Sequence, residues 1–575
     1  MDKLILEKAQ HWAKDPAFDP QFRAEISGLI DQNNEAELTD RFYKDLEFGT
    51  GGLRGIIGAG SNRINSYTVR RATQGMATYI KKAQIPNPSV AIACDSRNFS
   101  DTFAQEAALV LAANQIKVFL YDSLRPTPML SFAVRHLGAT AGIVITASHN
   151  PKEYNGYKVS WSDGCQVTPP HDQGIIDEVN GIQDFGSIKT MDFEAAKAQG
   201  LIQIIGDEID QPYYALVKGL SLGERKNHTN FGVVYTPLHG AGNLPVRHML
   251  AEAGFEQVTV VASQELPDGD FPTVASPNPE EASALEEAQK AAGPNDQLIM
   301  ATDPDSDRIG GMARDKAGQW AKLNGNQIGQ LLLDFYLTRL EQKDELPAQG
   351  HMITTIVTST LAKKIAEDKG LLVDEVLTGF KYIGEKMAQL DSTAGHQFVF
   401  GTEESHGYLF GDFVRDKDAV SAAMIFAEMA ATMAAQGKTL FDRLEEIHVQ
   451  YGYHSDELVN RTFKGKEGAE KILRIMQSLR QQPPAQIAGV QVSTIRDYQS
   501  SEITTTGSGA KESIDLPKSN VLAFLLADGS RITARPSGTE PKIKFYFNLT
   551  GENPTELKAQ QERYIQEFVA LIETI

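Results

Sequence analysis

Residues 141–155 read A-G-I-V-I-T-A-S-H-N-P-K-E-Y-N, and this stretch decides the fold. Its apolar run, Ile143-Val144-Ile145, predicts a strand that is buried on both faces. The strand leads directly into a polar turn, Thr146 to Pro151, and ligands of α/β proteins meet the chain at such strand ends. A hydroxyl beside a histidine in that turn, Ser148 and His149, is well placed to carry a phosphoryl group. The simpler interpretation is a turn whose Ser and Asn side chains only satisfy their own backbone.

Composition limits the function classes. A chain of 575 residues is expected to form about three to five domains of roughly 100–200 residues each. Its hydrophobic fraction of 41% and charged fraction of 23% are typical of soluble proteins. The formal charge of −20 argues against general binding to nucleic acid or anionic lipid. Any phosphate site must therefore be built locally, from a few cations and backbone N–H groups.

The amino-terminal sequence, the hydropathy pattern and the cysteine count predict a cytoplasmic location. The first residues, M-D-K-L-I-L-E-K-A-Q, carry acids and no long apolar core, unlike a signal peptide. No apolar run approaches the roughly 18 residues of a membrane span. Two cysteines, Cys94 and Cys165, fit a reducing compartment better than a disulfide framework. We therefore expect no membrane and no nucleic-acid partner.

Strands and helices alternate along the chain, which predicts α/β layers with parallel or mixed sheets. After an acidic helical stretch over 1–47, three cycles follow, each placing polar loops after apolar strands. The predicted strands are 90–94, 116–121, 141–145, 231–235, 258–261, 298–301, 352–357, 373–377 and 398–400. The predicted helices are 67–82, 99–114, 129–137, 280–292, 326–339, 360–368 and 418–435, with another starting near 244. Residues 456–575 are expected to form a smaller α+β unit with a hairpin turn at Asp528-Gly529.

A triplet of aspartates follows the predicted strand 298–301. Asp303, Asp305 and Asp307 alternate with other residues, and three like charges in one place repel unless a cation lies among them. A calcium EF-hand loop is excluded, because Arg308 replaces its sixth-position glycine and Arg314 its final glutamate. The pattern favours Mg²⁺ shared with a phosphate oxygen, against a solvated acidic turn.

Three other polar segments, and one lysine, each allow two interpretations, a ligand-binding site or an ordinary structural feature. Arg535-Pro536-Ser537-Gly538-Thr539, followed by Lys542, suits a phosphate dianion but could be an ordinary turn. Glu403 and Ser405 can bind neighbouring sugar hydroxyls, or can begin a helix as its cap and first turn. Arg54 lies among glycines in F-G-T-G-G-L-R-G, a weak signal for an anion site, and Lys417 by itself reads as a surface lysine.

Taken together, these motifs resemble the α-D-phosphohexomutase superfamily, the phosphoglucomutase/phosphomannomutase group. T-A-S-H-N-P, D-P-D-S-D-R and R-P-S-G-T-E-P occur in the family's order, and the resemblance spans essentially the whole chain. It implies three similar α/β domains with mixed sheets and a smaller α+β C-terminal domain around a central cleft. The expected domains are 1–205 with the phosphoserine loop, 206–324 with the metal loop, 325–455 with the sugar-binding loop and 456–575 with the phosphate-binding loop.

The resemblance also implies residue roles. Ser148 is the expected phosphorylated serine, and Mg²⁺ is expected between the phosphoserine, Asp303, Asp305 and Asp307. Arg54 and His149 would lie beside that phosphate, and Lys158 matches the family's catalytic lysine. The expected substrate-binding residues are Arg308, Gly379, Lys381, Glu403, Ser405, Lys417, Arg535, Ser537, Gly538 and Thr539. The family's last phosphate-loop arginine is missing after Thr539, where Lys542 or Lys544 could substitute with a less bidentate grip.

The implied reaction moves a phosphoryl group from phosphoserine to a sugar hydroxyl and back from the other end of a bisphosphate sugar. The loops F-G-T-G-G-L-R-G and G-Y-L-F-G-D-F-V-R-D-K-D resemble the branch that includes phosphoglucomutases and phosphopentomutases. We therefore expect conversion of glucose 1-phosphate to glucose 6-phosphate, with glucose 1,6-bisphosphate as activator, ahead of phosphopentose and phosphomannose substrates. From other classes, a metal-dependent sugar phosphatase or a catalytically silent sugar-phosphate binding protein would share these motifs.

Overall fold

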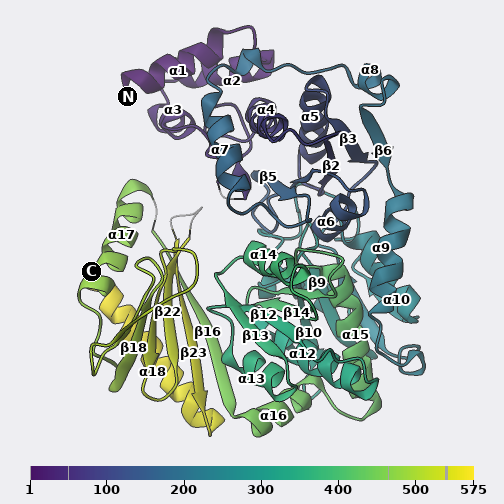
Figure 1. Ribbon diagram of the computed structural model, residues 1–575, viewed down its shortest axis with the longest axis vertical. Helices are drawn as coiled ribbons and strands as arrows, with labels where there is room; N and C mark the ends of the chain where they lie inside the picture. The colour runs from purple at the N-terminus through teal and green to yellow at the C-terminus, as the bar shows by residue number, and fades with distance from the viewer. Residues whose placement is uncertain (1, 50, 464, 538–541) are drawn as a thin grey trace. The chain divides into compact units, whose positions relative to one another are not determined.

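The computed structural model describes residues 2–49, 51–463, 465–537 and 542–575 (Figure 1). The chain packs into two compact units. The first combines Met1–Asn324, Phe380–Gly401 and Ser405–Gly437, and the second combines Gly325–Gly379, Thr402–Glu404 and Lys438–Ile575. The fold class predicted from the sequence, α/β with mixed sheets and a C-terminal α+β part, is confirmed.

Three helices at the amino-terminal end confirm the helical prediction for 1–47. They are α1 (Lys3–Lys14), α2 (Pro20–Asp31) and α3 (Glu35–Phe42). Each begins at a capping side chain, Asp2, Asp19 or Asn34, which accepts a hydrogen bond from a backbone N–H of the first turn. Trp12 stacks on Phe18 at a centroid distance of 4.1 Å, and these rings form a small core of their own.

The first sheet has the strand order β1-β5-β4-β2-β3-β6. Its strands are β1 (Gly52–Ile56), β2 (Ser89–Cys94), β3 (Lys117–Tyr121), β4 (Ala141–Ile145), β5 (Tyr154–Trp161) and β6 (Ile202–Ile205). The accompanying helices are α4 (Ser66–Lys82), α5 (Ser100–Ala113), α6 (Thr127–His136), α7 (His171–Gly181), α8 (Phe193–Ala198) and α9 (Asp207–Gly219), with the 3-10 turn η1 (Phe185–Ser187). β2, β3, β4 and β6 run parallel, whereas β5 pairs antiparallel with both β4 and β1.

Both faces of β4 are covered, as its continuous apolar sequence predicts. Ile143 and Ile145 belong to one hydrophobic cluster with residues of α4, α5 and α7. On the opposite face Gly142 lies against Val134 of α6, and a Cβ added there would come within 2.6 Å of the Val134 side chain. The strand that delivers Ser148 is therefore rigidly held from both sides.

The second sheet has the order β11-β10-β9-β7-β8. Its strands are β7 (Gly232–Thr236), β8 (Val258–Val260), β9 (Asp296–Thr302), β10 (Ile309–Arg314) and β11 (Trp320–Leu323), and its helical elements are η2 (Arg225–Asn227), α10 (Asn243–Ala253), η3 (Ala282–Leu285) and α11 (Glu286–Ala291). The helix predicted for 280–292 is wrong in part. Glu280 closes a turn in which its N–H donates to Asn278 Oδ1, so only a 3-10 turn and a short helix follow.

The third group of elements comprises α12 (Gly325–Gln342), β12 (Gly350–Thr355), α13 (Thr360–Asp368), β13 (Leu372–Val376), α14 (Phe380–Asp391), β14 (Gln397–Glu403), β15 (Gly407–Phe410), α15 (Ala419–Ala435) and α16 (Leu440–Tyr451). β12 and β13 pair in parallel, with Met352 opposite Val373. α15 is buried over most of its length, and its N-cap Asp418 accepts hydrogen bonds from the N–H groups of Val420 and Ser421.

The carboxyl-terminal part is a largely antiparallel sheet with the order β16-β23-β22-β21-β18-β19-β20, joined at β18 by β17. The elements are β16 (Tyr453–Thr462), α17 (Gly465–Gln481), β17 (Gln486–Ile487), β18 (Val490–Asp497), β19 (Glu502–Thr505), β20 (Lys511–Ser513), β21 (Leu522–Leu526), β22 (Arg531–Pro536), β23 (Lys542–Gly551) and α18 (Pro554–Glu573). Figure 1 shows these strands side by side with α18 against them. Phe568 of α18 packs on Phe524, Phe545 and Phe547, and the predicted hairpin turn is confirmed at Gly529, where φ is 85°.

His454 of β16 makes the stability of this part depend on pH. Burial lowers its pKa to about 4, although its Nδ1 lies 2.9 Å from the Gly452 carbonyl. Between about pH 6.5, the usual pKa, and pH 4 the unfolded chain binds more protons at this residue, so stability falls as the pH is lowered through that window. We expect the free energy of unfolding to lose about 3 kcal/mol from this group. Urea unfolding of the wild type and His454→Asn at about pH 7 and pH 4 measures it, and equal losses in both chains would contradict it.

Among the described residues, no single helix has the length and apolar composition needed to cross a membrane; α15 and α16 meet that test only when counted together across their break. Cys94 and Cys165 are both free and buried. The domain boundaries expected from the sequence stay a prediction.

Candidate functional site

Ser148 lies in the turn directly after β4 and is 3% exposed. Its backbone takes a left-handed conformation with φ of 52°, rare for a residue with a side chain, and its N–H donates to Thr146 Oγ1 at 2.7 Å. Its Oγ donates to Asp303 Oδ2 at 2.7 Å and lies 3.1 Å from His149 Nδ1. The hydroxyl thus contacts a carboxylate from a loop 155 residues further along the chain.

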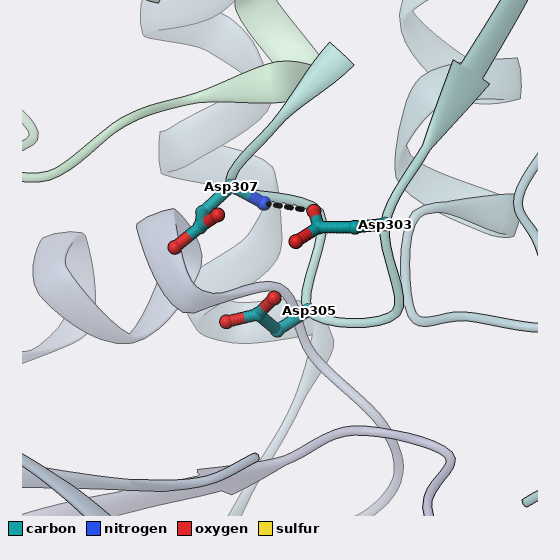
Figure 2. Close-up of side chains that lie close together, drawn as sticks. All are labelled: Asp303, Asp305 and Asp307. Carbon is teal, nitrogen blue, oxygen red and sulfur yellow. Dashed lines mark hydrogen bonds between the residues drawn. The ribbon is translucent and has the colours of Figure 1, made fainter. Parts of the chain in front are cut away.

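The three aspartates lie in the short loop between β9 and β10. Figure 2 shows Asp303, Asp305 and Asp307 with their carboxylates turned toward a common point, and one oxygen of each lies within 4.8 Å of the others. Asp303 Oδ1 accepts from the N–H groups of Asp307 at 3.1 Å and Arg308 at 3.0 Å, which closes the loop on itself. The alternating spacing therefore converges, as predicted, because the loop turns tightly at Ser306, where φ is 52°.

Burial gives these carboxylates unequal proton affinities. Asp303 and Asp305 are fully buried and Asp307 is 2% exposed. Burial, reinforced by the charges of Asp305 and Asp307, raises the pKa of Asp303 well above its usual range. Burial also opposes ionisation of Asp307, but Lys158 and Lys417 outweigh it and lower the pKa of Asp307. The cluster thus contains one carboxylate whose ionisation is opposed and one that two lysines keep ionised.

Two lysines contact the aspartates. Lys158 of β5 has its Nζ 2.7 Å from Asp305 Oδ2 and 3.2 Å from Asp307 Oδ2. Burial alone would lower the pKa of Lys158, but Asp305 and Asp307 raise it. Lys417 Nζ lies 3.1 Å from Asp307 Oδ2 and 2.8 Å from Asp416 Oδ1. The interpretation of Lys417 as a surface lysine is wrong, because it is 8% exposed and belongs to this cluster.

The triad fits a divalent metal ion. Asp305 Oδ1 and Asp307 Oδ1 are buried, and neither has a hydrogen-bond partner among the described residues. Buried carboxylate oxygens without donors cost free energy unless a cation binds them. The donor set is entirely oxygen, which Mg²⁺ prefers. An acidic cluster able to hold a metal ion is therefore part of this chain.

Arginines flank this cluster. Arg54 lies in β1, opposite Gly156 of β5, and its Nη1 donates to Asn150 Oδ1 in the Ser148 turn at 3.2 Å. Arg308 Nη1 donates to Glu280 Oε1 at 2.5 Å and to the carbonyl of Ser405 at 3.1 Å. The structure thus brings Arg54, Ser148, His149, Lys158, the three aspartates, Arg308, Ser405 and Lys417 together within the first unit.

The remaining predicted residues divide between the units. In the second unit Glu403 ends β14, and its Oε1 accepts from the Gly379 N–H at 2.8 Å. Strand β15 follows rather than a helix, so the helix-cap interpretation of Glu403 and Ser405 is wrong. Burial alone would lower the pKa of Arg535. Three neighbours raise it instead: Tyr546, whose hydroxyl lies 3.4 Å from Arg535 Nη1, and the carboxylates of Glu404 and Glu403.

Ser537 N–H donates to the Lys542 carbonyl at 2.8 Å, whereas Gly538 and Thr539 lie outside the described residues. Lys381, in the first turn of α14, belongs to the first unit. Burial lowers its pKa, against the opposing charges of Asp172 and Glu385.

Sequence reasoning missed several residues that fix this site. Thr127, the first residue of α6, donates from Oγ1 to Asp305 Oδ2 at 2.8 Å and from its N–H to the Asp305 carbonyl at 2.9 Å. Glu280 anchors Arg308, and Ser276 Oγ donates to the His149 carbonyl at 2.7 Å. Their local sequences carry no catalytic pattern, since each acts through a contact with a distant loop.

Comparisons with known proteins show which family this chain resembles along its length. Four successive family descriptions match: phosphoglucomutase/phosphomannomutase alpha/beta/alpha domain I at residues 45–185, domain II at 211–317, domain III at 324–451 and the C-terminal domain at 458–563. A phosphoglucomutase of Staphylococcus aureus (strain MRSA252) is 40% identical over 527 residues, covering 91% of this chain and 93% of that protein. A phosphoglucomutase of Staphylococcus saprophyticus is 38% identical over 546 residues, covering 95% and 98%.

Among solved structures, the Paramecium phosphoprotein pp63/parafusin, described as a phosphoglucomutase, shares the fold with a TM-score of 0.68 and 20% identity, over 92% of this chain and 96% of that one. The four family descriptions match nearly the whole chain, in the same order as the loops of the site. The chain belongs to the phosphoglucomutase/phosphomannomutase family, a family of isomerases.

Proposed function

We propose that this chain interconverts glucose 1-phosphate and glucose 6-phosphate through a phosphorylated Ser148 and a glucose 1,6-bisphosphate intermediate. The observation that carries the proposal is the 2.7 Å contact between Ser148 Oγ and Asp303 Oδ2, inside a buried triad of carboxylates. A hydroxyl at the edge of a metal site is where a phosphoryl group can be held and activated. The two phosphoglucomutases at about 40% identity support glucose as the sugar.

The proposed step exchanges one P–O bond for another. A sugar hydroxyl attacks the phosphorus on Ser148, the new bond forms to the sugar oxygen, and the bond to Ser148 Oγ breaks. The proton of the attacking hydroxyl passes to a nearby base and ends on Ser148 Oγ. His149, with its Nδ1 at 3.1 Å from that oxygen, is the proposed base, while Lys158, which contacts Asp305 and Asp307, supplies positive charge to the carboxylate cluster.

Asp303, Asp305, Asp307 and the phosphoserine would hold Mg²⁺. When bound, this ion offsets negative charge on the phosphoryl oxygens and makes the phosphorus a better electrophile. Arg54, which contacts the Ser148 turn through Asn150, would bind a phosphate there with a planar pair of donors.

The proposed distal clamp binds whichever phosphate of the sugar is not reacting. Arg535 and Ser537, with Gly538 and Thr539 beyond the described residues, would form it, and Lys542 or Lys544 would take the place of the missing arginine. Arg308 and Lys381 are proposed to contact substrate as well. Glu403 and Ser405 are proposed to bind sugar hydroxyls, and Gly379 and Lys417 are proposed as further substrate-binding residues.

Glu403→Gln tests the sugar-binding assignment. Gln keeps an oxygen for the Gly379 N–H but removes the charge, so one charge-assisted hydrogen bond to the sugar is weakened. We expect KM for glucose 1-phosphate to rise by about 10- to 100-fold, as for the loss of one such bond. Glu345→Gln, an exposed change in the same unit, is the control. An unchanged KM in Glu403→Gln would remove Glu403 from the substrate site.

Rates on three substrates test the function itself. Conversion of glucose 1-phosphate is expected to exceed that of ribose 1-phosphate and mannose 1-phosphate. Equal or faster turnover of ribose 1-phosphate would reassign the chain as a phosphopentomutase. Release of inorganic phosphate without isomerisation would show a phosphatase, in which water replaces the sugar hydroxyl.

Further parts of the proposal concern organisation and setting. We propose domains at 1–205, 206–324, 325–455 and 456–575, a cytoplasmic location, and a phosphosugar as the partner, with no role for nucleic acid or membrane.

A further inference from the structure

Arg97 is a buried arginine of the first unit. It follows β2 in the stretch Asp95-Ser96-Arg97 and is 3% exposed. β2 is the parallel neighbour of β4, with Cys94 opposite Ile145, and the Asp95 N–H donates to the Ile145 carbonyl at 3.1 Å. The loop that carries Arg97 therefore lies directly beside the turn that carries Ser148.

The guanidinium of Arg97 donates to four backbone carbonyls, three in that turn and one at Tyr154, the first residue of β5. Its Nη1 lies 3.0 Å from the carbonyl oxygens of Pro151 and Tyr154. Its Nη2 donates to the carbonyl of Ser148 itself at 2.5 Å and to the carbonyl of Asn150. One side chain thus ties the second half of the Ser148 turn to the start of β5 and contacts the peptide of the reactive serine.

Only a guanidinium suits this arrangement. Four carbonyl oxygens converge on the guanidinium, those of Ser148 and Asn150 in buried contacts and those of Pro151 and Tyr154 in part-buried ones. A buried carbonyl needs a hydrogen-bond donor. A planar fork with two donors on each terminal nitrogen satisfies them all, whereas an ammonium group offers three donors from one point. The carbonyls converge because the chain reverses through Ser148 in its left-handed conformation.

Arg97 is itself held in place by its neighbours. Asp95 Oδ1 accepts from the Arg97 N–H at 3.0 Å and from Ser100 Oγ at 2.8 Å. Asp95 Oδ2 lies 3.4 Å from Arg97 Nε, and both side chains are fully buried. The ring of Phe271, from the loop that follows the second sheet's β8, lies 5.0 Å from the guanidinium carbon.

We propose that Arg97 is a positioning residue that fixes the backbone of the Ser148 turn and thereby aims Ser148 Oγ at Asp303 and the metal site. Its effect on catalysis rests on the function proposed above. A displacement of about 1 Å at a reacting oxygen can cost on the order of 100-fold in rate. Loss of the guanidinium should therefore reduce kcat while leaving KM for the phosphosugar, which other loops bind, nearly unchanged.

The test compares Arg97→Met and Arg97→Lys with a matched control, Arg71→Met. Arg71 is also a buried arginine of the first unit and donates to a carbonyl, that of Val179, at 3.2 Å, away from Ser148. We expect kcat to fall about 100-fold or more in Arg97→Met and less in Arg97→Lys, with KM within about threefold of the wild type. Crystals of Arg97→Lys should show Ser148 Oγ moved away from Asp303 Oδ2.

Arg97→Met with kcat near the wild-type value would overturn the proposal, as would a rise in KM alone. So would an equal loss of kcat in Arg71→Met at the same melting temperature, because the effect would then be one of stability. If neither Arg97 variant folds, kcat of Asp95→Asn is measured instead. This substitution keeps the guanidinium but removes the charged carboxylate that lies 3.4 Å from Arg97 Nε. An unchanged kcat would overturn the proposal. Failure of the proposed function can be told apart from failure of this inference. In the first case the wild type would not convert glucose 1-phosphate, and the crystal structure of Arg97→Lys would still show whether Arg97 positions Ser148.

Discussion

Ser148→Ala is expected to abolish interconversion of glucose 1-phosphate and glucose 6-phosphate, with kcat reduced by about 10⁴-fold or more. The substitution removes the one oxygen that accepts and returns the phosphoryl group, and water cannot replace a covalent carrier. Folding should be retained, since Ser148 Oγ makes one hydrogen bond to Asp303 and one contact with His149. A coupled assay of glucose 6-phosphate formation, with a melting curve, measures both quantities.

Ser123→Ala is the control, because Ser123 is an exposed serine of the same unit. It should keep wild-type kcat. An active Ser148→Ala enzyme would mean that the carrier is another residue, or that the phosphoryl group moves directly from one sugar to another.

Asp303→Asn is expected to lower kcat by about 100- to 1,000-fold and to abolish the stabilisation by Mg²⁺ that the proposed metal site predicts for the wild type. The shape of the side chain is kept, and its Oδ1 can still accept from the N–H groups of Asp307 and Arg308. One negative charge is removed from three buried carboxylates. Without metal, the variant should therefore melt no lower than the wild type and be more stable by about 1 kcal/mol, because like charges repel.

Melting curves with and without MgCl₂, together with kcat, make these two effects separable. Asp101→Asn, at an exposed position in the first turn of α5, should respond to Mg²⁺ as the wild type does. A variant Asp303→Asn that melts well below the wild type without metal would show that the carboxylate is structural. A variant that keeps its response to Mg²⁺ would place the ion elsewhere.

Much of the fold could be predicted from local patterns. The strand β4 is apolar without interruption because helices cover both its faces, and α13 begins and ends at the predicted residues. β5 was not predicted, although Tyr157 to Trp161 alternate apolar and polar residues as a half-buried strand does. Its antiparallel pairing with β1 and β4 is set by tertiary contacts that the local sequence does not show. The failure at Glu280 has the same origin, since a turn and the contact with Arg308 override helix propensity.

For the site, the sequence predicted the candidate reactive and metal-binding residues better than it predicted the contacts that position them. The spacing of the aspartates predicted their convergence, and the resemblance to a family predicted that Ser148 lies with them. The burial of Lys417 against Asp307 could not be read from its charged neighbours, which suggest a surface loop. The role of Arg97 could not be predicted from the sequence for a related reason. Its four hydrogen-bond acceptors are backbone carbonyls, and a pattern of side chains does not reveal such contacts.

The most direct test of the account is the fate of one phosphoryl group. The enzyme with Mg²⁺ is incubated with glucose 1,6-bisphosphate, and its intact mass and peptides are then analysed. The account predicts one added phosphoryl group, on the peptide and residue of Ser148, and its loss when glucose 6-phosphate is added. Phosphate on a different residue, or an enzyme that interconverts the two glucose phosphates while Ser148 never becomes phosphorylated, would contradict it.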